Sequence, residues 1–359
     1  MHMLKDIARS VLRKKKRPGI ESLASAELGS LLFGQLHPEH QNFFDRHNGQ
    51  HTRVELRDFP HYAFWRDREH ENPGDGTYHE YLACSWKYYY GDSLNTSEKR
   101  FEKISTYLKL KEEIETSGIR KPLRVMITPD DKRVLLDGNH RASIAYALGL
   151  DAPCIHVPLK DALFKIVSNK DERYGTGRKN RPYQSVYYKD REILQGRRRD
   201  ILERFRKMDV VGDIRGRDVL DMGSNIAVNA MTAWHFGARS VTAMEYSPRI
   251  AASALRLSAV MDARVNLIVQ DLGLPVATER QYDTVFCFSL YMHIKDKVML
   301  ERNIDRLTRS TLYFEGHERT SRMDYEHIFK CFQKVEALGF NRDGIHSQES
   351  TRPFFRCTR

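Results

Sequence analysis

The chain has 359 residues, enough for two domains of the usual size of roughly 100–200 residues. Its 40% hydrophobic and 30% charged residues exclude a disordered or collagen-like chain, and no apolar run approaches the ~18 residues that a membrane-spanning helix requires. The formal net charge of +11 favours anionic partners, and nucleic acid, an anionic membrane, an acidic glycan and a nucleotide cofactor all fit it. The five scattered cysteines, without a Cys-x-x-Cys motif, predict neither a disulfide framework nor a metal site.

Residues 1–20 form a basic, amphipathic N-terminal segment. Leu4, Ile7 and Val11 recur at helical spacing, and a run of five basic residues over 13–17 follows them. Such a segment either lies on an anionic membrane, with residues 4–17 as the contact, or is a solvated tail. Because no secretory signal pattern is present, we expect the protein in the cytoplasm, either free or held peripherally at the inner face of the membrane.

The pattern over residues 21–168 predicts an α+β domain. The predicted elements, in chain order, are helices over 21–36 and 99–116, strands over 123–128 and 133–137 joined by a hairpin, a helix over 142–148 and a strand over 154–157. The aromatic and histidine-rich stretch between the first two helices is either core or a surface that stacks bases or sugars.

A glycine turn joins the second strand of this hairpin to the next helix. This turn favours anion binding, because it follows a strand end and opens a helix with His and Arg on its first turn. Free backbone N–H groups and basic side chains therefore converge there. The residues of this candidate anion or nucleotide site are Asp137, Gly138, Asn139, His140 and Arg141. Over about 122–158 the sequence resembles the ParB/sulfiredoxin-like fold, which implies that His140 and Arg141 hold a nucleotide or phosphate, or that the domain only recognises an acceptor. Asn139 stands where sulfiredoxins carry their reactive cysteine, so reductase chemistry is not implied.

Residues 169–182 lack an apolar period and are rich in Gly, Pro and charge, which predicts a linker. Strands and helices then alternate over 183–359, as in an open, mostly parallel α/β sheet. The predicted strands are 218–222, 241–246, 265–270, 282–290 and 311–315, with helices over 226–236, 247–261, 295–307 and 321–332 between them. The chain end predicts two more strands without a crossover helix, so that the last strand inserts antiparallel and completes a seven-stranded, Rossmann-like sheet.

Acidic residues end three successive strands of this predicted sheet. Asp221 ends the first and is followed by Gly223, which allows a positive φ, and by Asn225, which tolerates one. Glu245, at the end of the second strand, lies 22 residues after Gly223, close to the ~20 at which an acid meets ribose hydroxyls in nucleoside-binding sheets. Asp271 ends the third strand. The three acids therefore surround the crevice where such sheets bind ligands.

These motifs resemble those of the class I S-adenosylmethionine-dependent methyltransferases over roughly 183–359. The family's acid-x-Gly-x-Gly-x-Gly motif is matched by Asp221, Gly223, Asn225 and Ala227, so two of its three glycines are replaced. The resemblance implies S-adenosylmethionine as cofactor, with Asp221, Gly223 and Ser224 at the methionine part, Glu245 at the ribose, and Asp271 with Leu272 at the adenine. The end of strand 282–290 is implied to lie beside the sulfonium, and Tyr183 and Gln184 to form a lid over the cofactor. The predicted cofactor-binding set also includes Asn225, Tyr246 and Phe288. The alternatives are a Rossmann dehydrogenase or an inactive sheet domain. The Gly-x-Gly-x-x-Gly fingerprint of a dehydrogenase is absent here, and that fingerprint seldom begins with an acid.

Methyl transfer to a hydroxyl benefits from a base near the acceptor. His293 and His317 follow strand ends at the crevice and are the candidate catalytic bases, with Glu315 as the candidate orienter of His317. Three segments resemble methyltransferases of bacterial polysaccharide and sugar pathways: 181–186, 196–207 and 314–317. Segment 196–207 is predicted to form a basic helix. The resemblance implies that Arg197 and Arg199 bind an anionic acceptor or the cofactor carboxylate.

The sequence therefore predicts O-methylation of a sugar, surface glycan or related small molecule. The alternative is a nucleic-acid-binding or nucleic-acid-modifying protein, which the positive charge permits. Too few residues follow position 160 before the linker for the helix-turn-helix that ParB proteins carry, which weakens that alternative.

Overall fold

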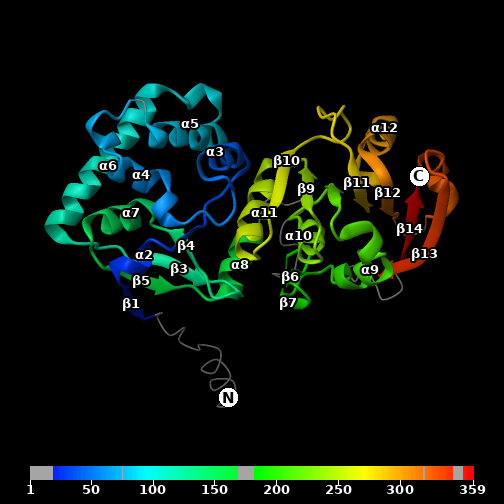
Figure 1. Ribbon diagram of the computed structural model, residues 1–359, viewed down its shortest axis with the longest axis horizontal. Coiled ribbons are helices and arrows are strands. Elements are labelled where there is room, and N and C mark those ends of the chain that lie inside the picture. Colours follow the sequence, from blue (N-terminus) through cyan, green and yellow to red (C-terminus); the bar gives the residue numbers. More distant parts are fainter. Residues whose placement is uncertain (1–18, 75, 169–181, 318–319, 343–350) are drawn as a thin grey trace, which may run out of the picture.

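The computed structural model describes residues 19–74, 76–168, 182–317, 320–342 and 351–359. The predicted membrane contact over 4–17 and nearly all of the predicted linker lie outside these residues. Two parts lie side by side, each with its own sheet, and they meet where helices α3 (Pro38–Asn48) and α8 (Leu159–Val167) pack against strand β10 (Val265–Val269) and helix α11 (Pro248–Val260) (Figure 1). In the described part of the chain, none of the helices has the length and apolar character needed to cross a bilayer.

The N-terminal part is built on a mixed five-stranded sheet. Its strands, in spatial order, are β1 (Ile20–Leu23), β5 (Ala152–His156), β3 (Leu123–Ile127), β4 (Arg133–Asp137) and β2 (Leu32–Phe33). The other helices of this part are α2 (Ser25–Leu28), α4 (Pro60–Arg66), α5 (Thr77–Tyr90), α6 (Ser97–Ser117) and α7 (Asn139–Leu148). The antiparallel β3–β4 hairpin, the long helix α6 and helix α7 confirm the predicted elements. The aromatic stretch supplies core residues here, since Phe59, Tyr78 and Tyr81 are buried.

The predicted helix over 21–36 is wrong. Leu23 pairs with Ala152 in β1, and Leu32 and Phe33 pair with β4, so only the short α2 is helical. At Gly34 a side chain would overlap the carbonyl oxygen of Leu135, so this glycine lets the chain lie close to β4. The apolar residues repeat at helical spacing, but burying them on two edges of a sheet outweighs that local preference.

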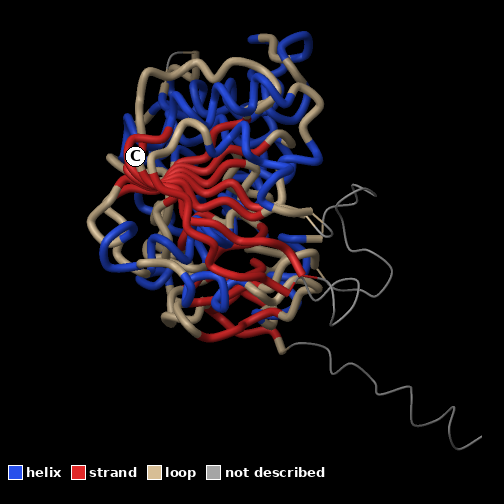
Figure 2. Tube along the Cα trace, turned by 90° about the vertical axis from the view of Figure 1, so that its right-hand side faces the viewer, coloured by secondary structure: helices blue, strands red, loops and turns tan. Residues whose placement is uncertain are grey.

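The C-terminal part is a seven-stranded sheet with helices on both faces (Figure 2). Its strands, in spatial order, are β10, β9 (Ser240–Glu245), β8 (Asp218–Met222), β11 (Tyr282–Phe288), β12 (Thr308–Glu315), β14 (Thr351–Thr358) and β13 (Lys334–Arg342). Its helices are α9 (Ile201–Lys207), α10 (Val228–His235), α11, α12 (Lys297–Leu307) and α13 (Glu326–Phe329), and the hairpin β6 (Val186–Tyr188) and β7 (Arg191–Leu194) precedes them. β14 runs antiparallel between β12 and β13, which confirms the predicted insertion of the last strand.

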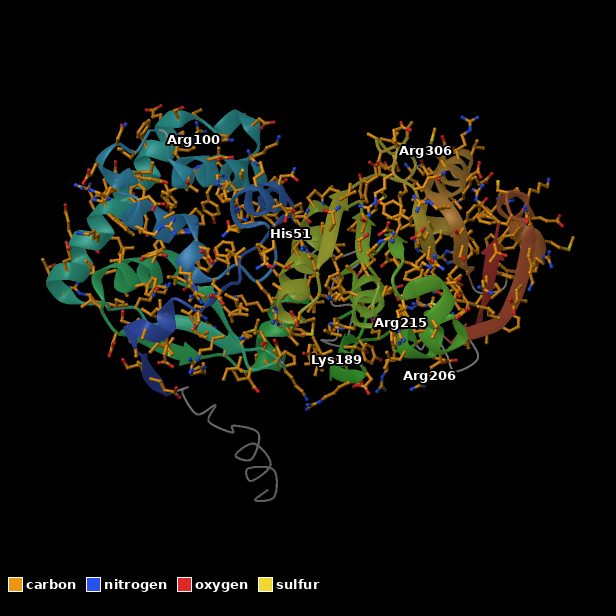
Figure 3. All side chains as sticks on the ribbon, in the orientation of Figure 1. His51, Arg100, Lys189, Arg206, Arg215 and Arg306 are labelled. Atoms are coloured by element: carbon orange, nitrogen blue, oxygen red, sulfur yellow. The ribbon has the colours of Figure 1, made fainter. Side chains whose placement is uncertain are left out.

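The N-terminal part caps the open edge of this sheet. The side-chain amide of Gln41 donates to the carbonyl oxygen of Leu267 (2.6 Å) and accepts from its N–H (2.7 Å), as a neighbouring strand would do. His51, labelled at the junction in Figure 3, contacts the carbonyl oxygen of Val265 through Nε2 (3.0 Å). Both side chains are buried. Pairing the edge of β10 in this way protects it from strand addition by another chain and fixes the two parts relative to each other.

Replacing Gln41 with alanine is expected to lower the free energy of unfolding by about 2 kcal/mol, because a backbone donor and a backbone acceptor lose their partners in a buried place. Urea denaturation measures this loss. Asn42→Ala, on the exposed face of the same helix, serves as the control and is expected to change stability by less than about 0.5 kcal/mol. Equal stability of the two variants would mean that water reaches the edge of β10.

Candidate active site

The loop after β8 has a left-handed backbone at three positions. Gly223 has φ of 69°, and Asn225 and Ala227 have φ of 52° and 58°. A β-carbon at Gly223 would lie 2.6 Å from the Leu290 side chain, so both conformation and space require glycine there. Asn225 and Ala227 adopt the same left-handed region, at an energetic cost to the alanine. The loop therefore takes this path with glycine at only one of the three positions.

Glu245 holds this loop in place. Its two carboxylate oxygens accept hydrogen bonds from the backbone N–H of Asn225 (2.9 Å) and of Ser247 (3.0 Å). The N–H of Ser224 also bonds to the carbonyl oxygen of Met244 on the same strand (2.9 Å). Burial raises the pKa of the Glu245 carboxyl, and the backbone donors oppose that rise. The acid predicted to meet the ribose thus also ties the ends of β8 and β9 together.

Asp221 is a buried carboxylate with an unused acceptor. The structure leaves its Oδ2 without a hydrogen-bond partner, and the same holds for Ser224 Oγ on the same loop and for Gln184 Oε1. Burial, together with the charge of Glu245, raises the pKa of Asp221 to about 7, although Arg204 opposes the shift. Native proteins rarely leave buried acceptors unpaired, so these atoms favour a ligand that brings hydrogen-bond donors.

The other predicted cofactor residues differ in their surroundings. Asp271 accepts from the backbone N–H of Gly273 (2.8 Å) and shapes the turn after β10. Leu272 is packed in the hydrophobic core, whereas the Tyr246 side chain is 71% exposed. Phe288 is buried at the end of β11. The structure thus places these residues at the carboxyl ends of neighbouring strands, with only Tyr246 turned largely to the surface.

The predicted lid segment pairs with the residues before α9. The carbonyl oxygen of Tyr183 accepts from the N–H of Arg198 (2.8 Å), and the N–H of Ser185 bonds to the carbonyl oxygen of Arg198 (2.9 Å). The predicted helix over 196–207 is therefore confirmed only over its second half, because α9 begins at Ile201 and Arg198 before it pairs with the lid segment. Arg197 lies over the Tyr183 ring at 5.6 Å, whereas Arg199 bonds to Glu192 on the surface. Of the two arginines predicted to bind an anion, only Arg197 lies against the lid.

Four charged residues form what we call the buried ion cluster: Arg198, Asp200, Arg204 and Glu315. Arg198 and Arg204 each bond to Asp200 at 2.7 Å and to Glu315 at 2.9 Å. The cluster carries two positive and two negative charges, and at most 4% of any of these side chains is exposed. Neither Arg198 nor Arg204 was predicted to pair with an acid, because no local pattern links them to Glu315.

Glu315 was predicted to orient His317, but its carboxylate is engaged elsewhere. Within the described residues its partners are Arg198, Arg204, Ser289 and Asn341, and none of its hydrogen bonds goes to His317. Although burial opposes ionisation, the two arginines hold the pKa of Glu315 well below its usual range. Glu315 therefore anchors the end of β12 to the segment before α9.

His293 and His317 lie together at the ends of β11 and β12. Their ring centres are 5.4 Å apart, and His317 Nε2 accepts from the backbone N–H of Met292 (3.3 Å). Burial, helped by the charge of Arg352, lowers the pKa of His317 to about 4 and also lowers that of His293. At neutral pH both rings are uncharged, the state in which an imidazole can accept a proton.

The N-terminal turn forms as predicted, with Gly138 at φ of 107°. Its polar side chains, however, form hydrogen bonds with other residues of the protein. Arg141 donates to the carbonyl oxygens of Lys121 and Pro122 and bonds to Asp137 (3.2 Å). His140 contacts the Tyr78 hydroxyl (2.8 Å), and burial lowers its pKa to about 3. The Asn139 amide bonds to Gln35 (3.3 Å). Phosphate binding at this turn stays a prediction, because a phosphate would have to compete with these contacts.

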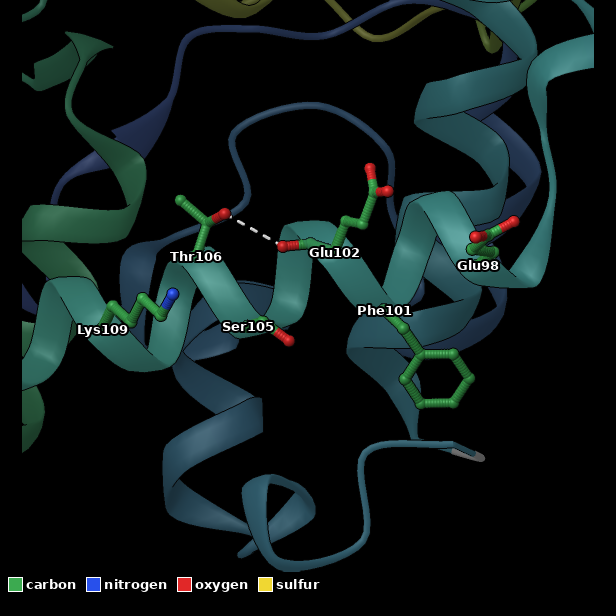
Figure 4. Close-up of a pocket in the computed structure, with 6 residues that line it drawn as sticks. All are labelled: Glu98, Phe101, Glu102, Ser105, Thr106 and Lys109. Atoms are coloured by element: carbon green, nitrogen blue, oxygen red, sulfur yellow. Dashed lines mark hydrogen bonds between the residues drawn. The ribbon is translucent and has the colours of Figure 1, made fainter.

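A surface hollow lies on the exposed face of α6 (Figure 4). It is lined by Glu98, Phe101, Glu102, Ser105, Thr106 and Lys109. All six residues are exposed, and Thr106 is already bonded to the carbonyl oxygen of Glu102 (2.9 Å). Such an open, solvated surface does not provide the enclosure that small-molecule sites usually have.

No family model and no curated protein matches the chain. Among solved structures, it is similar to magnesium protoporphyrin IX methyltransferase from Synechocystis PCC 6803 with bound SAH, at 15% identity and a TM-score of 0.36, over 41% of this chain and 76% of that chain. It is also similar to the N-terminal domain of EvdMO1 in the presence of SAH and D-fucose (15% identity, TM-score 0.38, 48% of this chain and 89% of that chain). A third similar structure is Thermoplasma acidophilum 1320 (18% identity, TM-score 0.34, 56% of this chain and 98% of that chain). These similarities are weak, and the function proposed below rests on the geometry of the site.

Proposed function

We propose that the C-terminal part is an S-adenosylmethionine-dependent methyltransferase. The observation that carries the proposal is that Asp221 and Glu245 lie at the carboxyl ends of two adjacent parallel strands, around a loop in which Gly223, Asn225 and Ala227 have positive φ. The sheet also differs from that of a Rossmann dehydrogenase. With the seven strands of this sheet numbered in chain order, the spatial order is 3-2-1-4-5-7-6, whereas the dinucleotide-binding order is 3-2-1-4-5-6 without an antiparallel insertion.

The residues present fit the cofactor. Asp221 Oδ2, Ser224 Oγ and Gln184 Oε1 are buried acceptors without partners, and the ammonium group of the methionine part would supply donors to them. Arg197 has a buried Nε without a partner, which suits a carboxylate. Glu245 stands where ribose hydroxyls would reach a carboxylate at a strand end. When bound, the cofactor supplies a methyl group that its sulfonium has already activated.

The protein's contribution to such a reaction is mainly positioning. Through Arg198, whose backbone pairs with the lid segment, the buried ion cluster joins that segment to Ser289 after β11 and to Glu315 at the end of β12, which fixes their relative positions. His293 and His317 are neutral and lie at the same strand ends, where either can accept the proton of an acceptor hydroxyl. The arrangement therefore suits an O-methyltransferase.

For the acceptor we propose a sugar, a glycan or a related small molecule with a hydroxyl group. The paired histidines support a hydroxyl over an amine, because an amine needs only to arrive neutral. Modification of nucleic acid remains the alternative that the net charge of +11 permits. The cytoplasmic location and the nucleotide, membrane and ParB/sulfiredoxin-like assignments of the N-terminal part stay predictions.

Asp221→Ala and Glu245→Ala are each expected to weaken S-adenosylmethionine binding by at least ~1.5 kcal/mol, because each removes a charge-assisted hydrogen bond from the crevice. Isothermal titration calorimetry measures the affinities. The matched control is Asp218→Ala at the opposite end of β8, where the carboxylate pairs with Arg239 and Ser240 and should not affect the cofactor. Wild-type affinity in both crevice variants would reject the assignment.

A further inference from the structure

Helix α3 joins the two parts of the molecule, and we infer that two buried histidines at its start make it a pH-sensitive latch. His37 directly precedes the helix, and His40 lies on its first turn, one residue before the Gln41 that pairs with the edge of β10. The latch is closed while both rings are neutral. Their protonation unfolds α3 locally and frees the edge of β10. The inference is independent of the proposed methyl transfer.

Both rings are packed in an aromatic core. Their ring centres are 3.4 Å apart, His37 is stacked on Tyr88 (4.3 Å), and His40 is stacked on Tyr81 (4.7 Å). Both tyrosines belong to α5, so the two histidines fasten α3 to the rest of the N-terminal part. The histidines are 0% and 1% exposed. A positive charge on either ring would be buried away from water, which costs free energy unless the charge is fully paired.

The fold does not supply that pairing. One nitrogen of each ring, Nε2 of His37 and Nδ1 of His40, is buried without a hydrogen-bond partner among the described residues. The other nitrogen contacts Glu39 (3.2 Å) in His37 and the Ser85 hydroxyl (2.9 Å) in His40. In the protonated form both nitrogens carry a hydrogen and need an acceptor. Each protonated ring would therefore leave one charged donor unpaired in the core.

Most charges around the two rings also oppose protonation. Arg256 of α11 donates to the backbone carbonyl that precedes His37 (2.9 Å), and its charge acts on both rings. A charge on His61 of α4 would act on His40 in the same sense. Glu39 opposes them, since it favours a charged His37. Tyrosines of α5 also face the rings and are uncharged at neutral pH: Tyr81, Tyr88 and Tyr89.

Loss of this packing releases the whole helix. An isolated helix of 11 residues is marginal in water, so α3 does not persist once it has left α5. Gln41 then loses the position from which its side chain pairs with Leu267. The exposed edge of β10 becomes open to strand addition by another chain.

The expected pH dependence follows from the sign of the pKa shifts. Burial lowers the pKa of both histidines in the closed state, whereas a solvated imidazole has a pKa of about 6.5. The closed state therefore keeps its full stability above pH ~6.5 and loses stability as pH falls below that value, because the open state takes up protons. Between pH ~7 and ~5.5 the opening equilibrium should rise ~10-fold for each histidine, and ~10²-fold for the two together.

The test follows the N–H of Leu267, which bonds to Gln41 Oε1 (2.7 Å) and is protected from exchange while α3 is in place. Hydrogen–deuterium exchange of the full chain, read by mass spectrometry with electron-transfer fragmentation, gives its protection factor from pH ~5.5 to ~8. The factor is corrected for the intrinsic exchange rate at each pH. In wild type it should fall ~10²-fold between pH ~7 and ~5.5. Leu220 in the central strand β8 should stay protected.

Two substitutions identify the groups that titrate. His37→Phe and His40→Phe keep an aromatic ring and remove the ionisable nitrogens, so each should reduce the fall to ~10-fold, and the double variant should abolish it. The matched control is His47→Phe on the same helix, where the side chain is 34% exposed and contacts Glu80 (3.0 Å). Water reaches that ring in the closed state, so the control should show a fall at least as large as wild type. Glutamine variants of His37 and His40 give the same comparison if a phenylalanine variant fails to fold.

The outcomes that contradict the latch are distinct. A protection factor of Leu267 that stays constant with pH in wild type would overturn the inference. So would a wild-type fall in the double variant, because the sensitivity would then lie in other groups. Parallel loss of protection at Leu220 would also overturn it, since acid would then unfold the whole C-terminal sheet. Gln41→Ala checks the reporter and should lower the protection of Leu267 at every pH.

Discussion

Replacing Glu315 with glutamine is expected to lower the free energy of unfolding by about 3–5 kcal/mol, the usual cost of removing one partner from a buried ion pair. The Glu315 carboxylate is 0% exposed and accepts from Arg198 (2.9 Å), Arg204 (3.0 Å) and Asn341 (2.8 Å). Its loss leaves two buried guanidinium groups with Asp200 as the remaining acid of the cluster. Urea denaturation monitored by circular dichroism measures the change.

Glu115→Gln is the control for this substitution, because Glu115 forms an exposed pair with Lys111 one helical turn away. That variant should lose less than about 0.5 kcal/mol. Since the arginines hold the pKa of Glu315 below its unfolded value, its stabilisation is present at neutral pH and is lost only as pH falls into strong acid. A loss below about 1 kcal/mol in Glu315→Gln would mean that water solvates the cluster.

His317→Ala is expected to lower kcat by ~10²-fold on a hydroxyl acceptor, the usual size of a general-base contribution. The pKa of His317 lies near 4, so the ring is uncharged at neutral pH and activity should fall only as pH drops toward that value. Its Nε2 accepts from Met292 N–H, so the neutral ring carries its proton on Nδ1. To act as base through Nε2, the ring must give up this 3.3 Å contact.

His293→Ala, measured alongside, distinguishes the two candidate bases. Calorimetry with S-adenosylhomocysteine should show nearly wild-type affinity in both variants, because neither histidine is among the residues predicted to bind the cofactor. The variant with the larger loss of kcat identifies the base. Full turnover in both would contradict the assignment and would indicate an amine acceptor or a base in another position.

The C-terminal sheet could be predicted because its signals are local. Each strand is a short buried run that ends in a polar turn. Asp221 and Glu245 lie within the last two residues of β8 and β9, and Asp271 comes two residues after β10. Parallel strands bring their carboxyl ends to one edge, so sequence position alone places these acids together. The helix expected over 21–36 failed for the opposite reason, since Leu23 and Leu32 are held by strands that lie more than a hundred residues further along the chain.

The buried ion cluster and the contact of Gln41 with the edge of β10 could not be predicted for a related reason. A basic run such as Arg197 to Arg199 usually forms a solvated surface, and nothing near Arg204 in the sequence indicates that it pairs with Glu315, 111 residues away. Gln41 likewise bonds to the backbone of Leu267, 226 residues away, and nothing in the sequence around a glutamine indicates which partner its side-chain amide will have. These hydrogen bonds and ion pairs join residues that are far apart in the sequence and come together only in the folded chain, so only the structure reveals them.

The most direct test of methyl transfer is to incubate the full chain with methyl-labelled S-adenosylmethionine and a panel of nucleotide sugars, lipid-linked glycans and RNA, and to identify labelled products by mass spectrometry. The Glu245→Ala variant serves as the matched control. The predicted result is a labelled methyl group on a sugar hydroxyl, formed by wild type and strongly reduced in Glu245→Ala. Label on RNA alone would favour the nucleic-acid alternative. The absence of labelled product from every acceptor, together with no measurable binding of the cofactor to wild type, would contradict the proposed methyltransferase.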